Sequence, residues 1–571
     1  MRILITFCFC LTSIVACFSQ LLEAESGALA GTQASMQRAG YSGTGYVTGF
    51  DADGDKVTMI ISTNVNAIYN LYIRYACPSG EKFNFVYVNG VNLGSVQFPA
   101  STVFRETLVG KLYLKKGANA IAIVKDWGYF DLDNMRLEVS ERSDINHIAG
   151  NLVTPTPSDK TNDLYRLLSK TYGKVILSGQ YGGDAELNKI RSAAGKLPLV
   201  RGFDLIDYSP SRMEHGTTST ETEKAIAWDA QRGIVTFSWH WNAPKDLLDV
   251  PGHEWWSGFY THATTFDVTK AMNDVTSEEY SLILRDIDVI AVQLKKLKDA
   301  NVPLLWRPLH EAEGTWFWWG AKGPEPCKWL WKLVFDRLVN HHQLNNLIWV
   351  WTSSASSAAL DWYPGGEYVD VIGADIYLPA GTYSSNFITF DNLVAIYEGK
   401  KIITLSENGP IPDAESLFQE GAAWSWFCTW SGDFILDGLS NTIPHIATVF
   451  NHEYVITLDE LDNVDNIIAA LEEKKEEEDD EDVLGFDEVA SRFFNYQNPI
   501  RNNRLSLTAK GSGYISKVII YNVQGQIQFT KDNTERSIQP LEFNFEGKSA
   551  GLYLVKIITP ELTKVLRVLK I

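Results

Sequence analysis

Residues 302–311 read Val-Pro-Leu-Leu-Trp-Arg-Pro-Leu-His-Glu, an apolar run that ends in an imidazole and a carboxylic acid. Seven similar runs occur along the chain, and helical patterns such as 281–297 and 328–338 separate several of them. This alternation predicts an α/β fold, and eight strand–helix units favour a closed (β/α)8 TIM barrel over an open doubly wound sheet. The predicted strands are Val175–Ser178, Leu197–Phe203, Ile234–Trp239, Val302–Leu309, Leu347–Thr352, Val369–Ala374, Ile402–Ser406 and Trp424–Trp430.

Polar and aromatic residues directly follow several of these strands. The carboxyl ends of barrel strands meet at one face, where active sites form. Glu311 follows the fourth strand and Glu407 the seventh, so their carboxyl groups are expected to face each other across one mouth. Glycoside hydrolysis needs this pair, an acid for the leaving oxygen and a second carboxylate opposite. The other residues at these strand ends are His240, Trp241, His310, Asp375 and Tyr377.

Ordinary structural roles remain open for some of these residues. His240 is also consistent with a core histidine, Asp375 with a structural hydrogen-bonding group, and Trp426 with either core packing or a platform beneath a sugar. The segment His310–Glu313 lacks the second histidine of a zinc-protease helix, so we expect no metal or other cofactor in catalysis.

Five segments of the predicted barrel carry a family resemblance: Trp306–Glu311, Trp316–Gly320, Ser238–Trp241, Ala374–Tyr377 and Ser406–Gly409. They resemble glycoside hydrolase family 26, a family of retaining β-mannanases, over about Pro157 to Leu458. The histidine directly before Glu311 is specific, because related barrel families carry asparagine there.

The resemblance implies that Glu311 is the general acid/base and Glu407 the nucleophile. Burial among tryptophans and the nearby Glu407 charge would keep Glu311 protonated near neutral pH. Tyr377 is expected to orient the nucleophile. The other residues expected to bind the substrate here are His240, Trp241, Arg307, His310, Trp316, Asp375 and Trp426.

The N-terminal region alternates apolar and polar residues in short runs, separated by turns such as Asn89-Gly90, which predicts a β-sandwich. The segments Glu23–Glu25, Gly40–Val47 and Trp127–Asp133 resemble a family 35 carbohydrate-binding module of jelly-roll fold. The resemblance implies sugar-binding loops and a structural calcium ion held by carboxylates and backbone carbonyls. The residues expected to bind sugar are Tyr41, Trp127 and Asp131, and those expected to hold calcium are Glu23, Glu25 and Asp133. Core packing for Trp127 and plain surface charge for the two glutamates are the alternatives.

The C-terminal region reads as short strands with glycine-containing turns, which predicts a small β-sandwich. The segments Asn498-Pro499, Val518–Gly525 and Ala550–Val555 resemble a type IX secretion sorting domain, although Gln497 departs from its usual start. The resemblance implies a secretion machinery as partner. An unrelated β-sandwich accessory domain is the alternative.

The N-terminus has the features of a secretory signal peptide, since Arg2 precedes the apolar run Ile3–Ala16. We expect cleavage after Gln20 and a secreted or cell-surface protein. The alternative is a lipoprotein box at Ile14–Cys17, which would leave Cys17 lipidated. The run is too short for a comfortable membrane span, and the three cysteines of the mature chain suggest neither a disulfide framework nor a zinc site.

The charge balance argues against some partners. The chain has 50 Lys+Arg and 70 Asp+Glu, a net charge of −20, which disfavours nucleic acid because such binding needs clustered basic residues. Anionic membrane surfaces are disfavoured for the same reason. Glu472–Asp482 holds nine acids and two lysines, as in a solvated linker or a frayed helix.

The sequence therefore predicts a secreted, monomeric, retaining endo-β-1,4-mannanase that acts on mannan, glucomannan or galactomannan. Two alternatives remain: the same mechanism on mixed-linkage β-glucan or β-1,3-xylan, and a noncatalytic polysaccharide-binding surface protein. Exo action also stays open, because loop lengths at the barrel mouth decide it. The predicted segments are a signal peptide (1–20), a sugar-binding sandwich (21–141), a linker (142–156), a catalytic barrel (157–458), an acidic linker (459–490) and a sorting domain (491–571).

Overall fold

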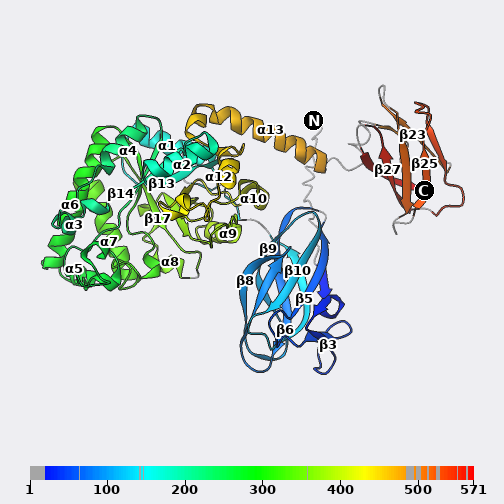
Figure 1. Ribbon diagram of the computed structural model, residues 1–571, viewed down its shortest axis with the longest axis horizontal. Helices are drawn as coiled ribbons and strands as arrows, with labels where there is room; N and C mark the ends of the chain where they lie inside the picture. The colour runs from blue at the N-terminus through cyan, green and yellow to red at the C-terminus, as the bar shows by residue number, and fades with distance from the viewer. Residues whose placement is uncertain are drawn as a thin grey trace, which may run out of the picture. The chain divides into compact units, whose positions relative to one another are not determined.

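The computed structural model describes residues 20–570 except 64, 141–142, 146, 149, 357, 484–493, 497–499, 501–502, 511–513, 523–526, 550 and 561–562. The chain forms two compact units, Met1–Val464 and Asp465–Ile571. The first contains a β-sandwich followed by a closed barrel, and the second contains a helix and small β-sheets (Figure 1). This order of elements confirms the predicted fold class. The predicted signal peptide lies outside the described residues, apart from Gln20.

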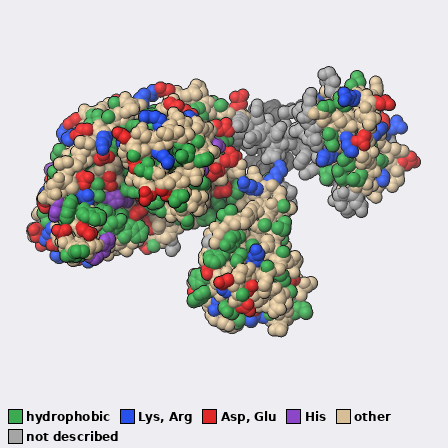
Figure 2. Space-filling view, in the orientation of Figure 1, with side chains coloured by type: hydrophobic (Ala, Val, Ile, Leu, Met, Phe, Trp, Pro, Cys, Tyr) green, Lys and Arg blue, Asp and Glu red, His purple; other side chains and the backbone are tan. Residues whose placement is uncertain are grey.

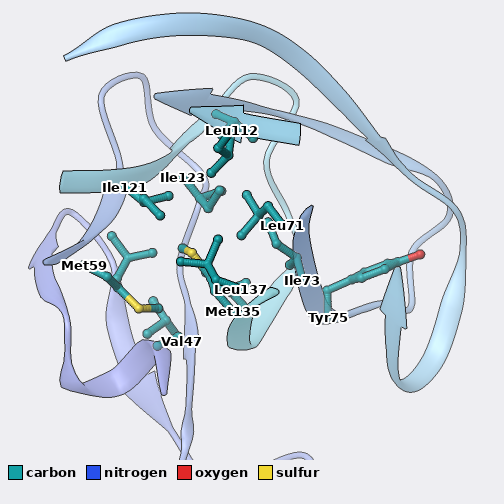
Figure 3. Close-up of a cluster of buried hydrophobic side chains, with 14 of the residues drawn as sticks. Val47, Met59, Leu71, Ile73, Tyr75, Leu112, Ile121, Ile123, Met135 and Leu137 are labelled. Atoms are coloured by element: carbon teal, nitrogen blue, oxygen red, sulfur yellow. The ribbon is translucent and has the colours of Figure 1, made fainter. Parts of the chain in front are cut away.

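Two antiparallel sheets form the N-terminal sandwich. One has the order β3-β4-β11-β6-β9, with β1 paired to β11, and the other has the order β2-β5-β10-β7-β8. Alternate side chains point inward from each strand, so that Met59 and Ile121 meet Leu71 and Leu137 between the sheets (Figure 3). The strands are β1 (Gln20–Glu23), β2 (Ala28–Ala30), β3 (Gln33–Ser35), β4 (Tyr46–Thr48), β5 (Lys56–Thr63), β6 (Ala67–Cys77), β7 (Lys82–Val88), β8 (Val91–Phe98), β9 (Ser101–Leu114), β10 (Gly117–Lys125) and β11 (Asp131–Val139).

Eight parallel strands close the barrel in chain order, from β13 to β20. Several are buried at every position, as expected for strands covered by helices outside and by side-chain layers inside. Figure 1 shows the helices around these strands. The strands are β13 (Gly179–Tyr181), β14 (Val200–Asp204), β15 (Ile234–Ser238), β16 (Leu304–Arg307), β17 (Leu347–Thr352), β18 (Val371–Ile376), β19 (Ile402–Asn408) and β20 (Phe427–Thr429).

Several helices of this unit begin at capping residues that the sequence supplies. The side chains of Ser158, Ser277 and Asp413 accept hydrogen bonds from backbone N–H groups of the first helical turn, which satisfies donors that a helix leaves unpaired. The helices are α1 (Asp159–Thr171), α2 (Asp184–Ala194), α3 (Pro210–Met213), α4 (Glu221–Asp229), α5 (Val268–Asn273), α6 (Glu278–Asp299), α7 (Pro324–Asp336), α8 (Ala359–Trp362), α9 (Phe387–Ile396), α10 (Ala414–Glu420), α11 (Asp433–Leu436) and α12 (Ile443–Phe450).

The first barrel strand differs from the prediction. The apolar run Val175–Ser178 contains β12 (Ile176–Leu177), which pairs with β21 (Val455–Ile456) outside the closed barrel. The barrel strand is the next one, β13. A Cβ atom at Gly179 would lie 2.2 Å from the Phe427 carbonyl oxygen, so close approach to β20 requires glycine there. A strand that reads Gly-Gln-Tyr gives no apolar signal.

The boundary between the units falls in the first turn of α13 (Val464–Val483), so much of the segment predicted as an acidic linker is helical. Two sheets follow, with strand orders β22-β23-β26 and β25-β24-β27-β28. Their inward side chains form one core that includes Leu505, Ile520 and Val555. The strands are β22 (Phe494–Asn495), β23 (Arg504–Ala509), β24 (Lys517–Asn522), β25 (Ile527–Asp532), β26 (Leu541–Asn544), β27 (Gly551–Ile558) and β28 (Thr563–Lys570).

Within the described part of the chain, no helix combines the length and hydropathy that a membrane crossing requires. Cys77, Cys327 and Cys428 are buried free thiols. Acidic and basic side chains are interspersed on the face of the molecule that Figure 2 shows.

Candidate active site

Three carboxyl groups meet at the carboxyl ends of the barrel strands. Glu407 lies within β19 and Asp375 within β18, and the two residues are register partners beside an irregularity in the pairing. Glu311 follows β16 and has a left-handed backbone with φ of 52°, which is uncommon for a residue with a side chain. One carboxylate oxygen of each residue lies within 4.8 Å of the others.

Arg307, at the end of β16, supplies the positive charge in this cluster. Its Nη1 donates to Asp375 at 2.8 Å, and its Nη2 forms an ion pair with Oε1 of Glu407. The guanidinium also donates to Thr352 and to the hydroxyl of Tyr181. Arg307 is fully buried, so its charge is compensated by the carboxylates and not by water.

Glu407 accepts hydrogen bonds on both carboxylate oxygens. Arg307 donates to Oε1, and the hydroxyl of Tyr377 donates to Oε2 at 2.6 Å. Two donors fixed on different strands hold the carboxylate in one orientation. Glu407 is only 3% exposed, whereas Tyr377, which donates to it, is 41% exposed.

Glu311 has a different environment, with one neutral donor and no cation in contact. Its Oε2 accepts a hydrogen bond from the indole Nε1 of Trp316 at 2.9 Å. Burial and the negative charge of Asp375 raise the pKa of Glu311 to about 7, because both disfavour the charged form.

Burial also raises the pKa of Glu407, and Arg307 opposes that rise. Two neighbouring carboxyls with raised pKa values hold a proton between them near neutral pH. Arg307 and Tyr377 both donate to Glu407, which favours its ionised form, so Glu311 is the better place for the proton. The arrangement thus offers one acid and one oriented carboxylate.

The same cluster is the one group of three or more metal-ligating side chains among the described residues. The Arg307 guanidinium already pairs with two of its three carboxylates. It therefore performs the charge compensation that a cation would otherwise provide.

Two histidines and several aromatic rings surround the carboxyl groups. His240 and His310 contact each other through their Nε2 atoms at 3.1 Å. Trp316 is 47% exposed at the mouth. Rings that the sequence analysis did not select also line this region: Tyr181, Phe259, Tyr260, Phe317 and Trp430.

Two of the tryptophans predicted to bind substrate are buried. Trp241 is fully buried, stacks on Trp239 at 4.0 Å and donates its indole N–H to Asp286. Trp426 is 1% exposed. Both rings are buried, and Trp241 packs toward α6, so neither presents an open face to a sugar.

The side chains of Arg307 and Asp375 are also buried, and both are hydrogen-bonded to other protein groups. Each is held in the ion-pair network behind Glu407, and Ser406 donates to Asp375 at 2.7 Å. His310 is 1% exposed. Substrate binding by these three residues stays a prediction.

Asp204 is a polar residue at this face that the sequence analysis does not select. It ends β14, and its Oδ2 lies 2.5 Å from His240 Nδ1. The rule that selected Glu407, a polar residue at the carboxyl end of an apolar run, also applies to Asp204. Tyr181 had no such signal, because its strand was not recognised.

In the sandwich, the predicted sugar-binding residues have unequal exposure. Trp127 is 63% exposed, and the neighbouring Tyr129, which was not predicted, is 59% exposed. Asp131 is 8% exposed and forms an ion pair with Arg38 at 2.6 Å. Tyr41 is partly buried against Tyr46. Trp127 is therefore the predicted residue that offers an open aromatic face.

The predicted calcium ligands do not converge as a group of three among the described residues. Asp133 is fully buried and forms an ion pair with Arg74. Glu23 and Glu25 flank Gly43, and Oε2 of Glu25 is buried with no hydrogen-bond partner. An unpartnered buried carboxylate oxygen beside a second carboxylate fits a hard cation such as calcium. Glu23 and Glu25 fit the predicted ion. Asp133 lies near them, since Ser42 Oγ bonds both Glu23 and Asp133, and its part in holding the ion stays a prediction.

Comparison with known proteins gives the same two modules. Residues 153–460 match the profile of glycosyl hydrolase family 26, and residues 20–140 match that of carbohydrate binding module family 35. A mannan endo-1,4-beta-mannosidase of Thermothelomyces thermophilus is 44% identical over 441 residues, which are 77% of this chain and 90% of that protein. Mannan endo-1,4-beta-mannosidase B of Piromyces sp is 36% identical over 469 residues, or 79% of each chain.

Solved structures agree with these relatives. The Podospora anserina GH26-CBM35 beta-(1,4)-mannanase has 44% identity and a TM-score of 0.59, with 78% of this chain and 98% of that chain covered. A ruminal GH26 endo-beta-1,4-mannanase has 31% identity and a TM-score of 0.62 over the same shares. Barrel, cleft carboxyls and relatives together show that this chain belongs to glycosyl hydrolase family 26.

Proposed function

We propose that this protein is a secreted, retaining endo-β-1,4-mannanase that hydrolyses mannan, glucomannan or galactomannan. The observation that carries the proposal is the pair formed by Glu311 and Glu407, of which one lacks a cationic partner and the other is held by Arg307 and Tyr377. The substrate class follows from the relatives, which bear the name mannan endo-1,4-beta-mannosidase.

In the proposed first step, Glu407 attacks the anomeric carbon of the sugar. The bond from that carbon to the glycosidic oxygen breaks, and Glu311 gives its proton to the leaving oxygen. In the second step, Glu311 takes a proton from water, the water oxygen bonds to the anomeric carbon, and the ester bond to Glu407 breaks. Oxygens of the two carboxyls lie within 4.8 Å, which supports retention, because retaining pairs stand about 5–5.5 Å apart and inverting pairs about 6.5–9.5 Å apart.

The N-terminal sandwich is proposed to hold the protein on the polysaccharide. The exposed ring of Trp127 offers a platform for the C–H face of a sugar, and attachment raises the concentration of the barrel near its substrate. A calcium ion bound by Glu23 and Glu25 would fix the loop around Gly43. It would have no part in the cleavage chemistry.

Export is proposed from the two ends of the chain. Arg2 and the apolar run after it fit a signal peptide removed after Gln20, and the C-terminal β-region fits a sorting domain that a secretion machinery recognises. The protein would act outside the cell, as a monomer.

Product analysis on linear mannan, galactomannan and barley β-glucan in parallel tests the proposal. We expect mixed manno-oligosaccharides from both mannans and no cleavage of β-glucan. Mannobiose alone would mean exo action, and cleavage of β-glucan alone would overturn the substrate. No product from any of the three would favour other backbones, such as β-1,3-xylan, or a binding protein without activity.

A further inference from the structure

Asp204, His240 and His310 form a row of polar side chains at the mouth of the barrel that the two cleavage steps do not use. Asp204 ends β14, and the two histidines follow β15 and β16. These three strands are neighbours in the barrel, so their carboxyl ends bring the side chains together.

The contacts within the row are short and continuous. Asp204 Oδ2 lies 2.5 Å from His240 Nδ1, while Oδ1 accepts hydrogen bonds from the backbone N–H groups of His240 at 3.1 Å and Ile206 at 2.9 Å. His240 Nε2 lies 3.1 Å from His310 Nε2. The side chains of Asp204 and His240 are 19% and 12% exposed.

The charges in this row, together with its contacts, favour one direction for its hydrogen bonds. Burial opposes ionisation of Asp204, but His240 and the backbone donors outweigh it, so the pKa of Asp204 is lowered. The carboxylate therefore accepts a proton-bearing nitrogen, His240 Nδ1. Burial and the neighbouring His240 and Arg307 lower the pKa of His310 far below its ordinary value. With its Nδ1–H donated to Asp204, a neutral His240 has its lone pair on Nε2, and we assign His310 Nε2–H as the donor to it across 3.1 Å.

This direction matters because His310 is directly bonded to Glu311. The carbonyl of His310 accepts a hydrogen bond from Trp319 at 2.9 Å, and Glu311 has the left-handed backbone already noted. If His240 changed tautomer, His310 would lose the hydrogen bond that orients its ring within its aromatic surroundings. A small shift of His310 would displace Glu311, the next residue in the chain. Errors of about 1 Å at a catalytic group can cost about 10²-fold in rate.

We propose that Asp204 is a positioning residue, which holds His240 in one tautomer and orientation and, through it, holds His310 beside Glu311. The inference rests on the proposed glycosidase function. An aspartate on a histidine nitrogen plays this orienting part in other catalytic sites. Asparagine could keep the backbone hydrogen bonds of Asp204 but would lack the negative charge that selects His240 Nδ1–H.

Asp204→Asn should lower kcat on soluble manno-oligosaccharides about 10²-fold and change KM less than about threefold. The melting temperature should stay unchanged, because Oδ1 can still accept the backbone N–H groups. Asp229→Asn is the matched control, since Asp229 pairs with Lys160 away from the cleft, and it should retain wild-type kcat. Unchanged kcat in Asp204→Asn would overturn the proposal, and so would a loss of kcat explained by a lowered melting temperature.

A double-mutant cycle separates positioning from a general effect on the fold. If Asp204 acts through His240, adding Asp204→Asn to His240→Ala should cost less than about twofold. A second 10²-fold loss in that background would contradict the proposal. Ring ¹⁵N shifts of His240 provide a readout that needs no activity: they should show Nδ1–H in the wild type and a tautomer mixture in Asp204→Asn, and an unchanged tautomer would contradict it. A wild-type protein that cleaves no mannan would instead refute the proposed function.

Discussion

Glu407 has both carboxylate oxygens engaged by donors that belong to other strands. Such a side chain is oriented before substrate arrives, which is what a nucleophile requires. Replacing it with alanine should lower hydrolysis of mannan by at least about 10⁴-fold, while retention on insoluble mannan should survive. Turnover at the wild-type rate in Glu407→Ala would remove the nucleophile assignment.

Glu311 should set the alkaline limit of the activity. Its pKa is raised to about 7, and the proton-bearing form is the acid, so kcat is present below that pH and is lost as pH rises through it. Initial rates on manno-oligosaccharides across pH 5–9 measure this loss of activity at alkaline pH. An activity that stays constant up to pH 9 would contradict the assignment.

Stability gives an independent check on Glu311. A carboxyl whose pKa is higher in the folded than in the unfolded chain binds protons more strongly when folded, so it lowers stability as pH rises. Glu311→Gln should therefore have a higher melting temperature than the wild type at pH 8, and the difference should vanish near pH 4. The sign would be reversed if the folded protein stabilised the ionised form.

Arg307 joins β16 to β13, β17, β18 and β19 through Tyr181, Thr352, Asp375 and Glu407. Removing the guanidinium leaves two buried carboxylates without a cation. Arg307→Ala should lower the free energy of unfolding by about 3–5 kcal/mol, measured by chemical denaturation. Arg166→Ala breaks an exposed ion pair with Asp163 and should cost less than about 0.5 kcal/mol. Equal effects of the two variants would contradict this account.

The stability of the sandwich should depend on calcium, because the side chains of Glu23 and Glu25 lie on either side of Gly43. EDTA should lower the melting temperature of the sandwich, and added calcium should restore it, because an ion that binds only the folded state stabilises it. Glu25→Gln should abolish the response. Glu106→Gln, which affects a surface pair with Arg136, should keep it. A wild-type melting temperature that changes with neither EDTA nor calcium would contradict the proposed calcium site.

The strand pattern predicted the barrel but located its first strand wrongly, for a reason visible at Gly179. Hydrophobic periodicity detects strands whose interior positions are filled by apolar side chains, and β13 fills its positions with Gly179, Gln180 and Tyr181. The seven other predicted strands each overlap a barrel strand, since their buried faces are apolar.

Site prediction succeeded where position along a strand decides what a residue can do, and failed where side-chain direction decides it. Strand ends placed Glu311, Glu407 and Tyr377 in one cluster of side chains. The same position does not tell whether a tryptophan is exposed or buried, and Trp241 and Trp426 are both buried. Polarity is a clearer signal than aromatic character, because burial of a tryptophan is the ordinary outcome.

The whole molecule combines a cleft with a separate aromatic surface on the sandwich. Trp127→Ala should weaken retention on insoluble mannan about 10- to 30-fold, if the exposed ring contributes about 2 kcal/mol, and should leave kcat on soluble oligosaccharides unchanged. Val103→Ala, at another exposed apolar position of the same sandwich, should change neither quantity. Unaltered retention in Trp127→Ala would move the sugar surface elsewhere.

The most direct test of the central claim is time-resolved NMR of the full chain acting on a linear β-1,4-manno-oligosaccharide. The anomeric signal of the new reducing end reports both cleavage of the bond and the stereochemistry of the step. We predict internal cleavage of the oligosaccharide. The β-anomer should appear first and then equilibrate with the α-anomer. The α-anomer as the first product would contradict retention through Glu407, and an intact substrate would contradict the mannanase assignment itself.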